Sequence, residues 1–513
     1  MVNEASSNTA KDGMPNLPKG WIWTDLKEIS LKLQSGGTPS TKVKEYYENG
    51  TIPFVKIEDM VNSEKYLTTT ITRITKEGLE NSSAWIVPKN SLLYSMYASY
   101  GVPIITKIEV ATNQAIIAYL TDDSLINSDF IYYYLISIKP TLKKNIRGTT
   151  QENLNANIVS NIPIALAPIS EQHRIVTKIE ELLTQLDAGA ASLKKVQAQL
   201  KRYRQAVLKA AFEGRLTQKW REEHKGEIEP ASELFNKISK SAKKKSKRKY
   251  DIPNSIEVDK QQGLPDEWVL TQIQEVGAVQ LGRQRAPEHH HGLNMRPYLR
   301  VANVFENFID ISDVKTMNFT PEEYEIYHLE YGDILLNEGQ SKELVGRPAM
   351  YRNEIPDVCF QNTLVRFRAY NGLIPEYALQ LFISYLHNGQ FLKIARQSTN
   401  IAHLGAERFS KSPFPLPPYL EQKEILSELD RNFSIITRIN DDVTTGLRQA
   451  EILRQSILKR AFEGKLVPQD PNDEPVSILL ELIKAKRARL AAEAKKGKAL
   501  QPKSPKGKVR NAN

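Results

Sequence analysis

Short polar clusters lie beside expected strand ends and turns in both halves of the chain, and their side chains suit hydrogen bonding. In the first half the candidate residues are Ser35, Gly36, Gly37, Thr38, Lys56, Tyr97, Asn113, Gln114, Arg147, Thr149 and Thr150. In the second half they are Arg283, Arg285, Arg300, Asn303, Gln340, Lys342, Arg347, Gln361, Asn362, Arg396, Asn400 and His403. Arg suits the edge of guanine, Asn and Gln suit adenine, and Ser, Thr and backbone N–H groups hold phosphates. As sets the clusters predict contact with DNA, whereas single members could instead be turn residues, strand caps or, for Tyr97, part of the core.

No catalytic signature accompanies these clusters. The sequence has no Gly-x-x-x-x-Gly-Lys-Ser/Thr loop, no Asn-Pro-Pro-aromatic tetrapeptide and no Gly-x-Ser-x-Gly turn. His289, His290 and His291 are adjacent, so on a loop they point in different directions, which favours a solvated loop over a metal site. We therefore expect a chain that is not an enzyme and holds no metal or cofactor itself.

Length and composition place these clusters in a multidomain globular protein. The chain has 513 residues, of which 40% are hydrophobic and 25% are charged, and a domain usually has about 100–200 residues. No apolar run reaches the roughly 20 residues of a membrane span, and the polar start contains no secretory signal. Cys359 is the one cysteine, which excludes an internal disulfide and fits a cytoplasmic location.

The net charge of +10 is concentrated in two stretches. Residues 237–249 carry eight Lys or Arg and no acid, and the segment from Lys484 to the end carries eleven against Glu493 alone. The rest of the chain is therefore net acidic, so a DNA-binding surface in it must be a local arrangement.

An internal repeat organises the whole chain. The segment RQAVLKAAFEGRL, from Arg204, and RQSILKRAFEGKL, from Arg454, share nine of thirteen residues at an offset of 250. Upstream, at the same offset, Pro163, Glu171 and Gln172 match Pro413, Glu421 and Gln422. The pattern predicts a tandem duplication in which a variable globular part precedes a similar helix.

Apolar residues at heptad spacing predict one long helix in each copy. The first seam comprises Ile175, Ile179, Leu182, Leu186, Leu193, Val196, Leu200, Tyr203 and Val207. The second comprises Ile425, Leu429, Ile436, Ile439, Val443, Ala450, Leu453 and Ile457. Gly214 and Gly464 are the expected helix ends, just beyond Phe212 and Phe462. Because a seam must be buried, we expect the two helices to pair antiparallel within the chain; packing on the helix's own globular part and homodimerisation are the alternatives.

The fold class expected is α/β, with two mixed α/β globular domains joined by two long antiparallel coiled-coil helices in a pseudo-twofold repeat. IPFVKI, AIIAYL, DILL, TLVRFR and YLRVANV predict strands, and residues 128–146 and 375–395 predict helices. The expected segments are a disordered start (1–16), a first domain (17–168) and helix (169–216), a basic linker with a short helix (217–263), a second domain (264–418) and helix (419–466), a short helix (467–490) and a basic disordered tail (491–513).

With these motifs the chain resembles the specificity subunit of type I restriction–modification enzymes. The resemblance covers roughly Leu17 to Leu490 and rests on the duplicated helix starts and AFEG ends, on GKLVPQDPNDEP and on GTIPFVKIEDM. It implies that each globular part is a target recognition domain reading one half of a bipartite, asymmetric DNA sequence. It also implies that the helices set the half-site spacing.

The resemblance further implies partners that perform the chemistry. Two modification subunits, carrying S-adenosylmethionine, would dock on the helical region and methylate adenine at N6. Two restriction subunits would add translocation and cleavage driven by ATP and Mg. We expect the helical docking region to include Ile175, Ile179, Leu186, Leu193, Leu200, Phe212, Ile425, Leu429, Ile436, Ile439, Leu453 and Phe462.

The basic linker and tail depart from the family's minimal pattern. They fit either nonspecific attraction to phosphates or simple solubilisation. Two functional alternatives remain open from the residues alone: a coiled-coil adaptor that binds only proteins, and a stand-alone DNA-binding regulator without catalytic partners.

Overall fold

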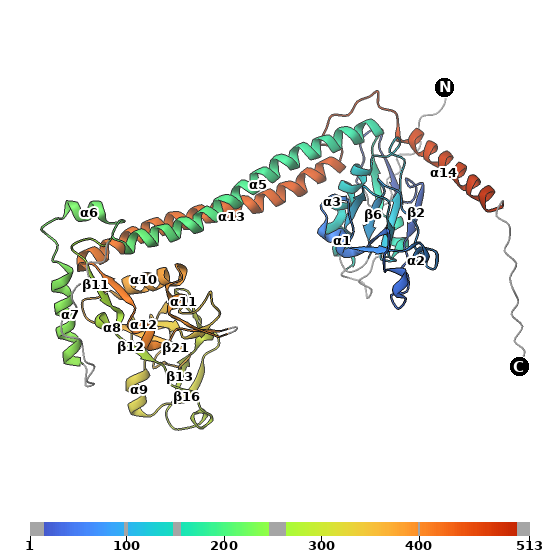
Figure 1. The fold of residues 1–513 in the computed structure, drawn as a ribbon. Coiled ribbons are helices and arrows are strands. Elements are labelled where there is room, and N and C mark those ends of the chain that lie inside the picture. The colour runs from blue at the N-terminus through green and yellow to red at the C-terminus, as the bar shows by residue number, and fades with distance from the viewer. Residues whose placement is uncertain (1–14, 97–100, 147–154, 246–262, 399–400, 500–513) are drawn as a thin grey trace, which may run out of the picture. The chain divides into compact units, whose positions relative to one another are not determined.

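The computed structural model describes residues 15–96, 101–146, 155–245, 263–398 and 401–499 (Figure 1). The chain forms two compact units, one of Met1–Ser192 with Gly446–Asn513 and the other of Leu193–Thr445. Each unit combines a mixed α/β domain with a part of each long helix, α5 (Ile169–Phe212) and α13 (Tyr419–Phe462). No helix in the described ranges is long and apolar enough to cross a bilayer.

The domain of the first unit alternates short strands with short helices. Its strands are β1 (Ile22–Asp25), β2 (Lys32–Ser35), β3 (Ile52–Val55), β4 (Tyr66–Leu67), β5 (Thr72–Ile74), β6 (Leu92–Ser95), β7 (Pro103–Thr106), β8 (Ala111–Thr112), β9 (Ile116–Leu120) and β10 (Pro163–Leu166). Its helices are η1 (Lys44–Tyr46), α1 (Ile57–Asn62), α2 (Lys76–Glu80), α3 (Ser128–Ile146) and α4 (Ala156–Ser160). The predicted strands in IPFVKI and AIIAYL and the helix 128–146 are confirmed.

Two sheets and a strand pair make up this first domain. One sheet has the order β2-β9-β6-β7-β4 and the other has the order β5-β3-β8, while β1 pairs with β10. The strands β6, β7 and β9 are apolar and almost wholly buried, so the larger sheet is covered on both faces. Phe130 of α3 packs edge to face on Trp21, which ties the helix to the core.

The domain of the second unit has the same plan with more strands. Its strands are β11 (Val269–Gln272), β12 (Gly277–Leu281), β13 (Met295–Leu299), β14 (Val304–Phe305), β15 (Phe308–Ile309), β16 (Lys315–Asn318), β17 (Ile334–Asn337), β18 (Gly339–Gln340), β19 (Pro348–Met350), β20 (Cys359–Phe360), β21 (Leu364–Ala369), β22 (Arg396–Gln397), β23 (Ala402–His403) and β24 (Pro413–Leu416). Its helices are α8 (Ile273–Val276), η2 (Pro287–His290), η3 (Val301–Asn303), α9 (Pro321–Tyr327), α10 (Pro375–His387), α11 (Gln390–Ile394) and α12 (Ala406–Ser410).

The sheets of the second domain repeat those of the first. The order β12-β21-β17-β19 corresponds to β2-β9-β6-β7, the order β16-β13-β20 corresponds to β5-β3-β8, and β11 pairs with β24 as β1 does with β10. Strands in DILL and TLVRFR are confirmed, whereas the strand predicted for YLRVANV ends at Leu299 and is followed by η3 and β14. The single helix predicted over 375–395 is wrong in one respect, because Gly389 adopts a left-handed φ of 77° and divides it into α10 and α11.

Within the second unit the two long helices run antiparallel. Tyr203 of α5 bonds Asn432 of α13 and Gln197 bonds Asn440, so the residue number falls along one helix as it rises along the other. Val207, Leu208 and Phe212 share a core cluster with Ile425 and Leu429. The predicted intrachain pairing is confirmed for this part of the seam.

The first unit shows the corresponding arrangement for the other helix halves. Asp187 of α5 forms an ion pair with Arg454 of α13. Ile175 and Ile179 of α5 share a core cluster with Ile457 and Phe462 of α13 and with residues of the domain. The helices therefore pack both on each other and on the domain. The predicted intrachain pairing and the alternative of packing on the globular part both occur.

Three predicted seam residues face solvent instead. Ile439 is 38% exposed, and Tyr203 and Leu453 are each 51% exposed. The half-buried positions nearby are Asn440, Arg204 and Arg454. The heptad assignment is wrong at these points because the seam shifts by one residue to polar side chains, which apolar periodicity alone does not reveal.

A buried Trp–Glu hydrogen bond secures the start of each long helix. Trp21 Nε1 donates to Glu171 Oε2 at 2.8 Å, and Trp268 Nε1 donates to Glu421 Oε2 at 2.8 Å. These residues come from the LP-x-x-W opening of each half and from the duplicated Glu-Gln pair. The two copies of the sequence repeat therefore also share a buried Trp–Glu hydrogen bond.

The segments after the two long helices pack on the domains. Helices α6 (Gln218–Glu223) and α7 (Ala231–Lys245) follow α5 in the second unit, and α14 (Val476–Ala499) follows α13 in the first. Gly214 and Gly464 have left-handed φ values of 71° and 66°, as the predicted helix ends require. The predicted short helices differ from the structure: the linker holds α6, which was not expected, as well as α7, and the helix expected over 467–490 begins and ends later, as α14.

Candidate nucleic-acid interface

In the first domain, most of the predicted polar residues meet at one end of the sheets, which we call the loop end. Gly36 N–H donates to the carbonyl of Ile116 at 3.1 Å and Gly37 N–H donates to that of Thr112 at 2.9 Å. Asn113 N–H donates to Val55 O at 3.4 Å, and Thr38 Oγ1 bonds the Gln114 side chain. Residues 35–38, Lys56, Asn113 and Gln114 are therefore neighbours, although the chain separates them widely.

The second domain has a loop end built from the same backbone bonds. Gly282 N–H donates to Leu364 O at 3.0 Å, Arg283 N–H donates to Phe360 O at 3.1 Å, and Gln361 N–H donates to Leu299 O at 2.9 Å. These bonds pair Gly36 with Gly282, Thr112 with Phe360 and Asn113 with Gln361 as equivalent positions. The scaffold is thus the same in both domains, while the side chains that it presents differ.

The segment after β3 or β13 is also equivalent. Lys56 N–H donates to Asp59 Oδ2 at 2.8 Å, and Arg300 N–H donates to Asn303 Oδ1 at 3.1 Å. Each bond caps a short helical turn directly after the strand. Lys56 and Arg300 consequently occupy corresponding places at the two loop ends.

The two glycines of the first loop end are there because the backbone is crowded. A Cβ on Gly36 would lie 1.9 Å from Thr112 O, and a Cβ on Gly37 would lie 2.1 Å from Ser83 Oγ. Gly282 is crowded in the same way by Gln361 O, at 2.2 Å. These glycines shape the loop end, and their contact with DNA stays a prediction.

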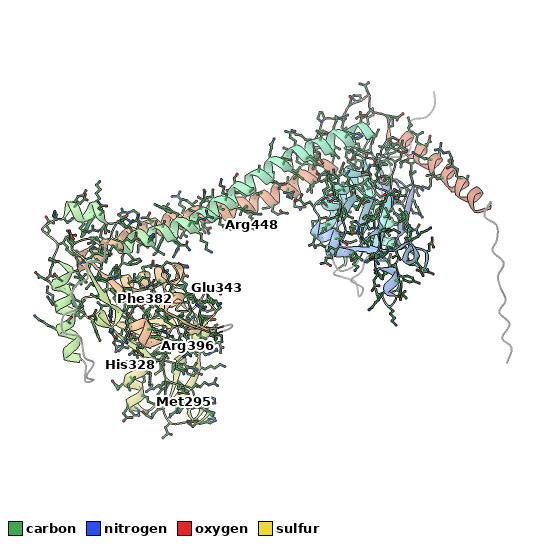
Figure 2. The ribbon with its side chains drawn as sticks, viewed as in Figure 1. Met295, His328, Glu343, Phe382, Arg396 and Arg448 are labelled. Atoms are coloured by element: carbon green, nitrogen blue, oxygen red, sulfur yellow. The ribbon has the colours of Figure 1, made fainter. Side chains whose placement is uncertain are left out.

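Two loops that leave the loop end of the second domain carry exposed cations. Lys342 follows β18, and Arg396 begins the β22–β23 hairpin, which pairs with β18. Both side chains are exposed and make no hydrogen bond or ion pair within the described ranges of the chain. Figure 2 shows Glu343 and Arg396 above Met295, which is at the start of β13. The Lys342 ammonium and the Arg396 guanidinium can therefore bind a phosphate or the acceptor atoms of a base edge.

Other predicted residues of the second domain serve internal contacts. Arg283 is buried, donates from Nε to Glu323 Oε1 at 2.7 Å and from Nη1 to Asn318 O at 2.7 Å, and lies 5.0 Å from the Phe319 ring centroid. Asn303 is buried and donates to the carbonyls of Asp310 and Asp313 at 2.9 and 3.1 Å. Sequence reasoning missed these roles, because an Arg or Asn in a loop gives no sign of a partner distant in the chain.

Arg300 and Arg347 are half-buried and also bound. Arg300 pairs with Asp313. Arg347 Nη2 donates to Val304 O at 2.6 Å, its guanidinium lies 4.6 Å from the Phe305 ring centroid, and burial lowers its pKa. Both cations therefore brace the segment after β13 in the described structure.

The remaining predicted residues occupy intermediate environments. His403 Nδ1 lies 3.0 Å from Glu338 Oε2, Arg285 Nε donates to His290 Nε2 at 3.0 Å, and Gln340 Oε1 accepts from Ser341 N–H at 3.1 Å. Asn362 N–H donates to Arg283 O at 2.9 Å, which holds it at the loop end. Tyr97, Arg147, Thr149, Thr150 and Asn400 lie outside the described residues.

Metal binding finds no support in the part of the chain that the structure describes. No cluster of three or more His, Cys, Asp or Glu side chains suitable for an ion occurs among these residues. His289 and His290 belong to the short helix η2, and His290 faces a guanidinium. Burial raises the pKa of the Cys359 thiol to about 12, so it is an unreactive core residue.

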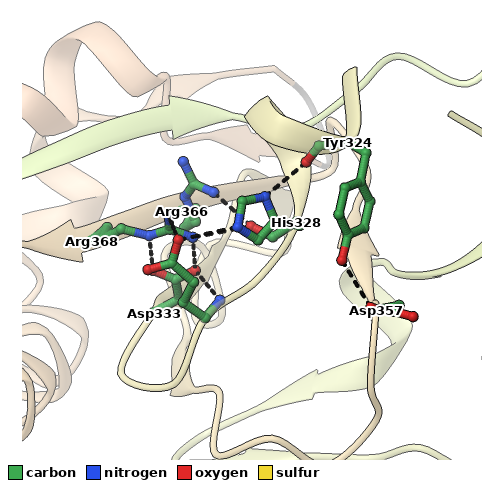
Figure 3. Close-up of polar contacts among 7 residues, drawn as sticks. Tyr324, His328, Asp333, Asp357, Arg366 and Arg368 are labelled. Carbon is green, nitrogen blue, oxygen red and sulfur yellow. Dashed lines mark hydrogen bonds and ion pairs between the residues drawn. The ribbon is translucent and has the colours of Figure 1, made fainter. Parts of the chain in front are cut away.

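An ion network braces the opposite end of the second domain (Figure 3). Arg368 donates from Nε and Nη2 to the two oxygens of Asp333, each at 2.6 Å. Arg366 Nη1 donates to His328 O at 2.9 Å, and burial lowers its pKa to about 10. Because Leu364 begins β21 at the loop end and these arginines lie farther along it, the network is a brace rather than a part of the interface. The TLVRFR pattern predicted the strand but not this network.

Comparison with known proteins identifies the protein family of this chain. The model of the type I restriction modification DNA specificity domain matches residues 18–202 and 265–445, which include both loop ends. The chain belongs to this family. The two matches coincide with the two repeats, so each α/β domain with its adjoining helix is one specificity domain.

Several specificity subunits are similar to this chain over nearly its whole length. The EcoKI specificity subunit of Escherichia coli strain K12 is 24% identical, covering 92% of this chain and 96% of its own. The EcoBI specificity subunit of Escherichia coli is 25% identical, covering 85% and 86%. This member of the family is thus a type I restriction–modification specificity subunit, whose role is DNA sequence recognition.

Solved structures share the fold. A chain from a study of complex assembly and conformational transition of the type I R-M system has a TM-score of 0.61 at 17% identity, covering 88% of this chain and all of that one. The HsdS subunit from Thermoanaerobacter tengcongensis has a TM-score of 0.51 at 16% identity, covering 88% and 99%. The specificity-subunit fold, with α/β domains and long antiparallel helices, is therefore the fold of this chain.

Proposed function

We propose that this specificity subunit reads a bipartite, asymmetric DNA target and directs adenine-N6 methylation and restriction, which partner subunits carry out. The observation that carries this proposal is the pair of loop ends, which share backbone hydrogen bonds but present different side chains. One scaffold with two sets of polar groups suits two half-sites of different sequence. In this proposal residues 17–168 and 264–418 are the target recognition domains.

The helices have a separate role in this proposal. Each of α5 and α13 has 44 residues, which at about 1.5 Å per residue is a rod of roughly 65 Å. Since DNA repeats its groove about every 34 Å, a stiff spacer can keep two readers in register. We propose that the helices set the length of the unspecified segment between the half-sites.

The chemistry belongs to the partners in this proposal. Two modification subunits supply S-adenosylmethionine and extrude the adenine, and two restriction subunits supply ATP- and Mg-dependent translocation and cleavage. This chain selects the DNA target and carries out no reaction step. Support comes from the family, and the residues at the loop ends are of kinds that recognise DNA rather than transform it.

A methylation map tests the proposal. The chain is expressed with the modification subunit of the same system in a host that lacks adenine methylation, and N6-methyladenine is then located by direct sequencing. The expected result is one interrupted site with two unlike specific parts. Expression of the modification subunit alone is the control and should give no such site.

Two results would contradict the proposal in different ways. Methylation without sequence preference would indicate a protein adaptor and not a reader. A single uninterrupted site would retain DNA reading but exclude two half-sites held apart by the helices.

A further inference from the structure

A small three-stranded sheet at the loop end of the second domain carries two exposed polar side chains. The strand order of this sheet is β18-β23-β22. Arg396 lies opposite His403 in one strand pair, and His403 lies opposite Gly339 in the other. Directly opposed residues of antiparallel strands point to the same face. Because the neighbouring Ala402 is fully buried in the core, Arg396 and His403 point to the other face, toward solvent.

Backbone hydrogen bonds anchor this sheet to the loop end. Glu338, which precedes β18, donates its N–H to Thr363 O at 2.9 Å. Leu404, which follows β23, donates its N–H to Glu338 O at 2.7 Å. Thr363 directly follows Gln361 and Asn362 of the loop end. The sheet therefore adjoins the polar groups that we propose contact DNA.

The surroundings of His403 hold its ring in one orientation. Its Nδ1 lies 3.0 Å from Glu338 Oε2, and the Glu338 side chain is only 20% exposed. A Cβ on Gly339 would lie 3.2 Å from His403 Cε1, so the glycine leaves room for the ring. Arg408 Nη2 donates to His403 O at 2.8 Å, which fixes the backbone. A preorganised side chain loses little conformational entropy on binding.

The contact with Glu338 determines which atom of the ring can bind a ligand. A carboxylate oxygen only accepts hydrogen bonds, so the proton of the neutral ring lies on Nδ1. Nε2 then carries a lone pair, and it has no hydrogen-bond partner in the portion of the chain that the structure describes. Because the His403 side chain is 49% exposed, Nε2 can accept a hydrogen bond from a group outside the chain.

DNA bases offer the donor that this nitrogen needs. In the major groove adenine presents its N6 amino group and cytosine presents its N4 amino group, whereas guanine presents the acceptors N7 and O6. A phosphate oxygen has no hydrogen to donate, so Nε2 is suited to a base and not to the DNA backbone. Arg396, on the same face, adds a cation that can hold a phosphate or a guanine beside this base.

We propose that His403 is a specificity-determining residue of the second domain, whose Nε2 accepts a hydrogen bond from the exocyclic amino group of an adenine or a cytosine. Glu338 is the positioning residue that holds the ring in the tautomer needed for this bond, and it contacts no DNA itself. The inference rests on the proposed function and deepens it, because it assigns one base contact to one atom of this chain.

The test measures binding of the full chain, in complex with the modification subunit, to duplexes that contain its target. Each adenine or cytosine in the half-site of the second domain is replaced in turn by purine or pyrimidinone, which lack the amino group. At one position this replacement should weaken binding to the wild type by about fivefold more than binding to His403→Ala. The cost of weaker base pairing is common to both proteins and cancels in this comparison.

Variants of Glu338 separate positioning from folding. Glu338→Ala should lose most of the discrimination at the same position although His403 is present, and Glu338→Gln, which keeps an acceptor oxygen, should retain part of it. His328→Ala is the matched control (Figure 3). His328 Nε2 also lies near a glutamate, 3.1 Å from Glu330 Oε1, but at the opposite end of the domain, so this variant should keep full discrimination. A cooperative thermal transition shows that each variant is folded.

Four results would contradict these assignments at different points. Equal losses for the wild type and His403→Ala at every amino position would overturn the base contact. A loss that depends on His403 only when guanine N7 is replaced by carbon would overturn the acceptor role, because the ring would then be a donor. Full discrimination in Glu338→Ala would overturn the positioning role. A wild-type complex that binds DNA without sequence preference would instead refute the proposed function.

Discussion

Arg221 donates hydrogen bonds from both Nε and Nη2 to one carboxylate oxygen of Glu421, at 3.0 and 2.9 Å. Thr217 Oγ1 donates to the same oxygen at 2.7 Å, and Trp268 Nε1 donates to the other oxygen at 2.8 Å. At the equivalent position of the first unit, Glu171 keeps its Trp21 bond, but its Oε1 has no partner among the described residues. The repeat has therefore kept the buried Trp–Glu bond and changed its surroundings.

This asymmetry predicts unequal costs for one substitution. Glu421→Gln removes the charge that Arg221 and Thr217 satisfy, so it should destabilise the second unit by about 2–3 kcal/mol. Glu171→Gln keeps an acceptor for Trp21 and relieves an unpaired buried oxygen, so its cost should stay below about 1 kcal/mol. Hydrogen exchange, followed separately in the two units, measures both, and equal costs would refute this account.

A pH effect should come from the first unit. Burial raises the pKa of Glu171 above its ordinary value of 4.5. The folded state then binds a proton more tightly than the unfolded state, so stability falls as pH rises from about 4.5 through the folded pKa and is constant above it. The difference in unfolding free energy between the wild type and Glu171→Gln should follow this course; a difference that grows with pH would contradict it.

Arg283 and Arg396 should behave differently, although the sequence predicts DNA contact for both. Arg283→Ala leaves Glu323 and Asn318 O without their buried donor and should cost about 2–3 kcal/mol of stability. Arg396→Ala should change stability by less than about 0.5 kcal/mol but reduce the salt dependence of DNA binding by about one contact. Thermal unfolding and binding at several salt concentrations distinguish the two. Unimpaired DNA binding by Arg396→Ala would remove it from the interface.

The two helix isoleucines predicted for the seam form another matched pair. Ile436 is 7% exposed and Ile439 is 38% exposed. Ile436→Glu buries a charge and should destabilise the helix pair by about 3 kcal/mol or more, whereas Ile439→Glu should be nearly neutral for stability. Circular dichroism during urea unfolding measures both. If Ile439→Glu releases the modification subunit while the fold persists, Ile439 belongs to a docking surface and not to the seam.

Exchange of one recognition domain tests whether the halves read independently. Residues 17–168 are replaced by the corresponding domain of a relative with a different target, with Trp21 retained to bond Glu171. The methylation map should then change in one part of the site only, because each loop end has its own side chains. A change in both parts would show that the domains do not read separately.

Much of the fold follows from local patterns. Apolar runs predicted the strands in TLVRFR and AIIAYL, and the duplicated glycines Gly214 and Gly464 predicted the helix ends, because each depends on residues near in sequence. The seam was wrong at Leu453, where a polar neighbour takes the inward position. A heptad count cannot detect such a shift when the replacement is Arg454, which is held by Asp187 from the other helix.

The candidate site was less predictable than the fold. Residue type and loop position placed Lys342 and Arg396 on exposed loops, but the same criteria selected Arg283, which has internal partners distant in the chain. The Trp–Glu bonds and the network around Asp333 were also not predicted, because the residues that form them are far apart in the sequence. Polar pairs between residues far apart in the chain produce no periodic pattern in a single sequence.

Main-chain hydrogen bonds close the segment that follows β6 in the first domain and β17 in the second. Ser95 N–H donates to Val102 O at 3.1 Å, and Asn337 N–H donates to Arg347 O at 3.2 Å. Between these anchors the chain has residues 96–101 in one case and 338–346 in the other. Since backbone bonds do not depend on side-chain identity, mutation, insertion and recombination can renew what lies between the anchors while the core survives. If these loops contact DNA as proposed, such changes give a new recognition sequence on an unchanged fold.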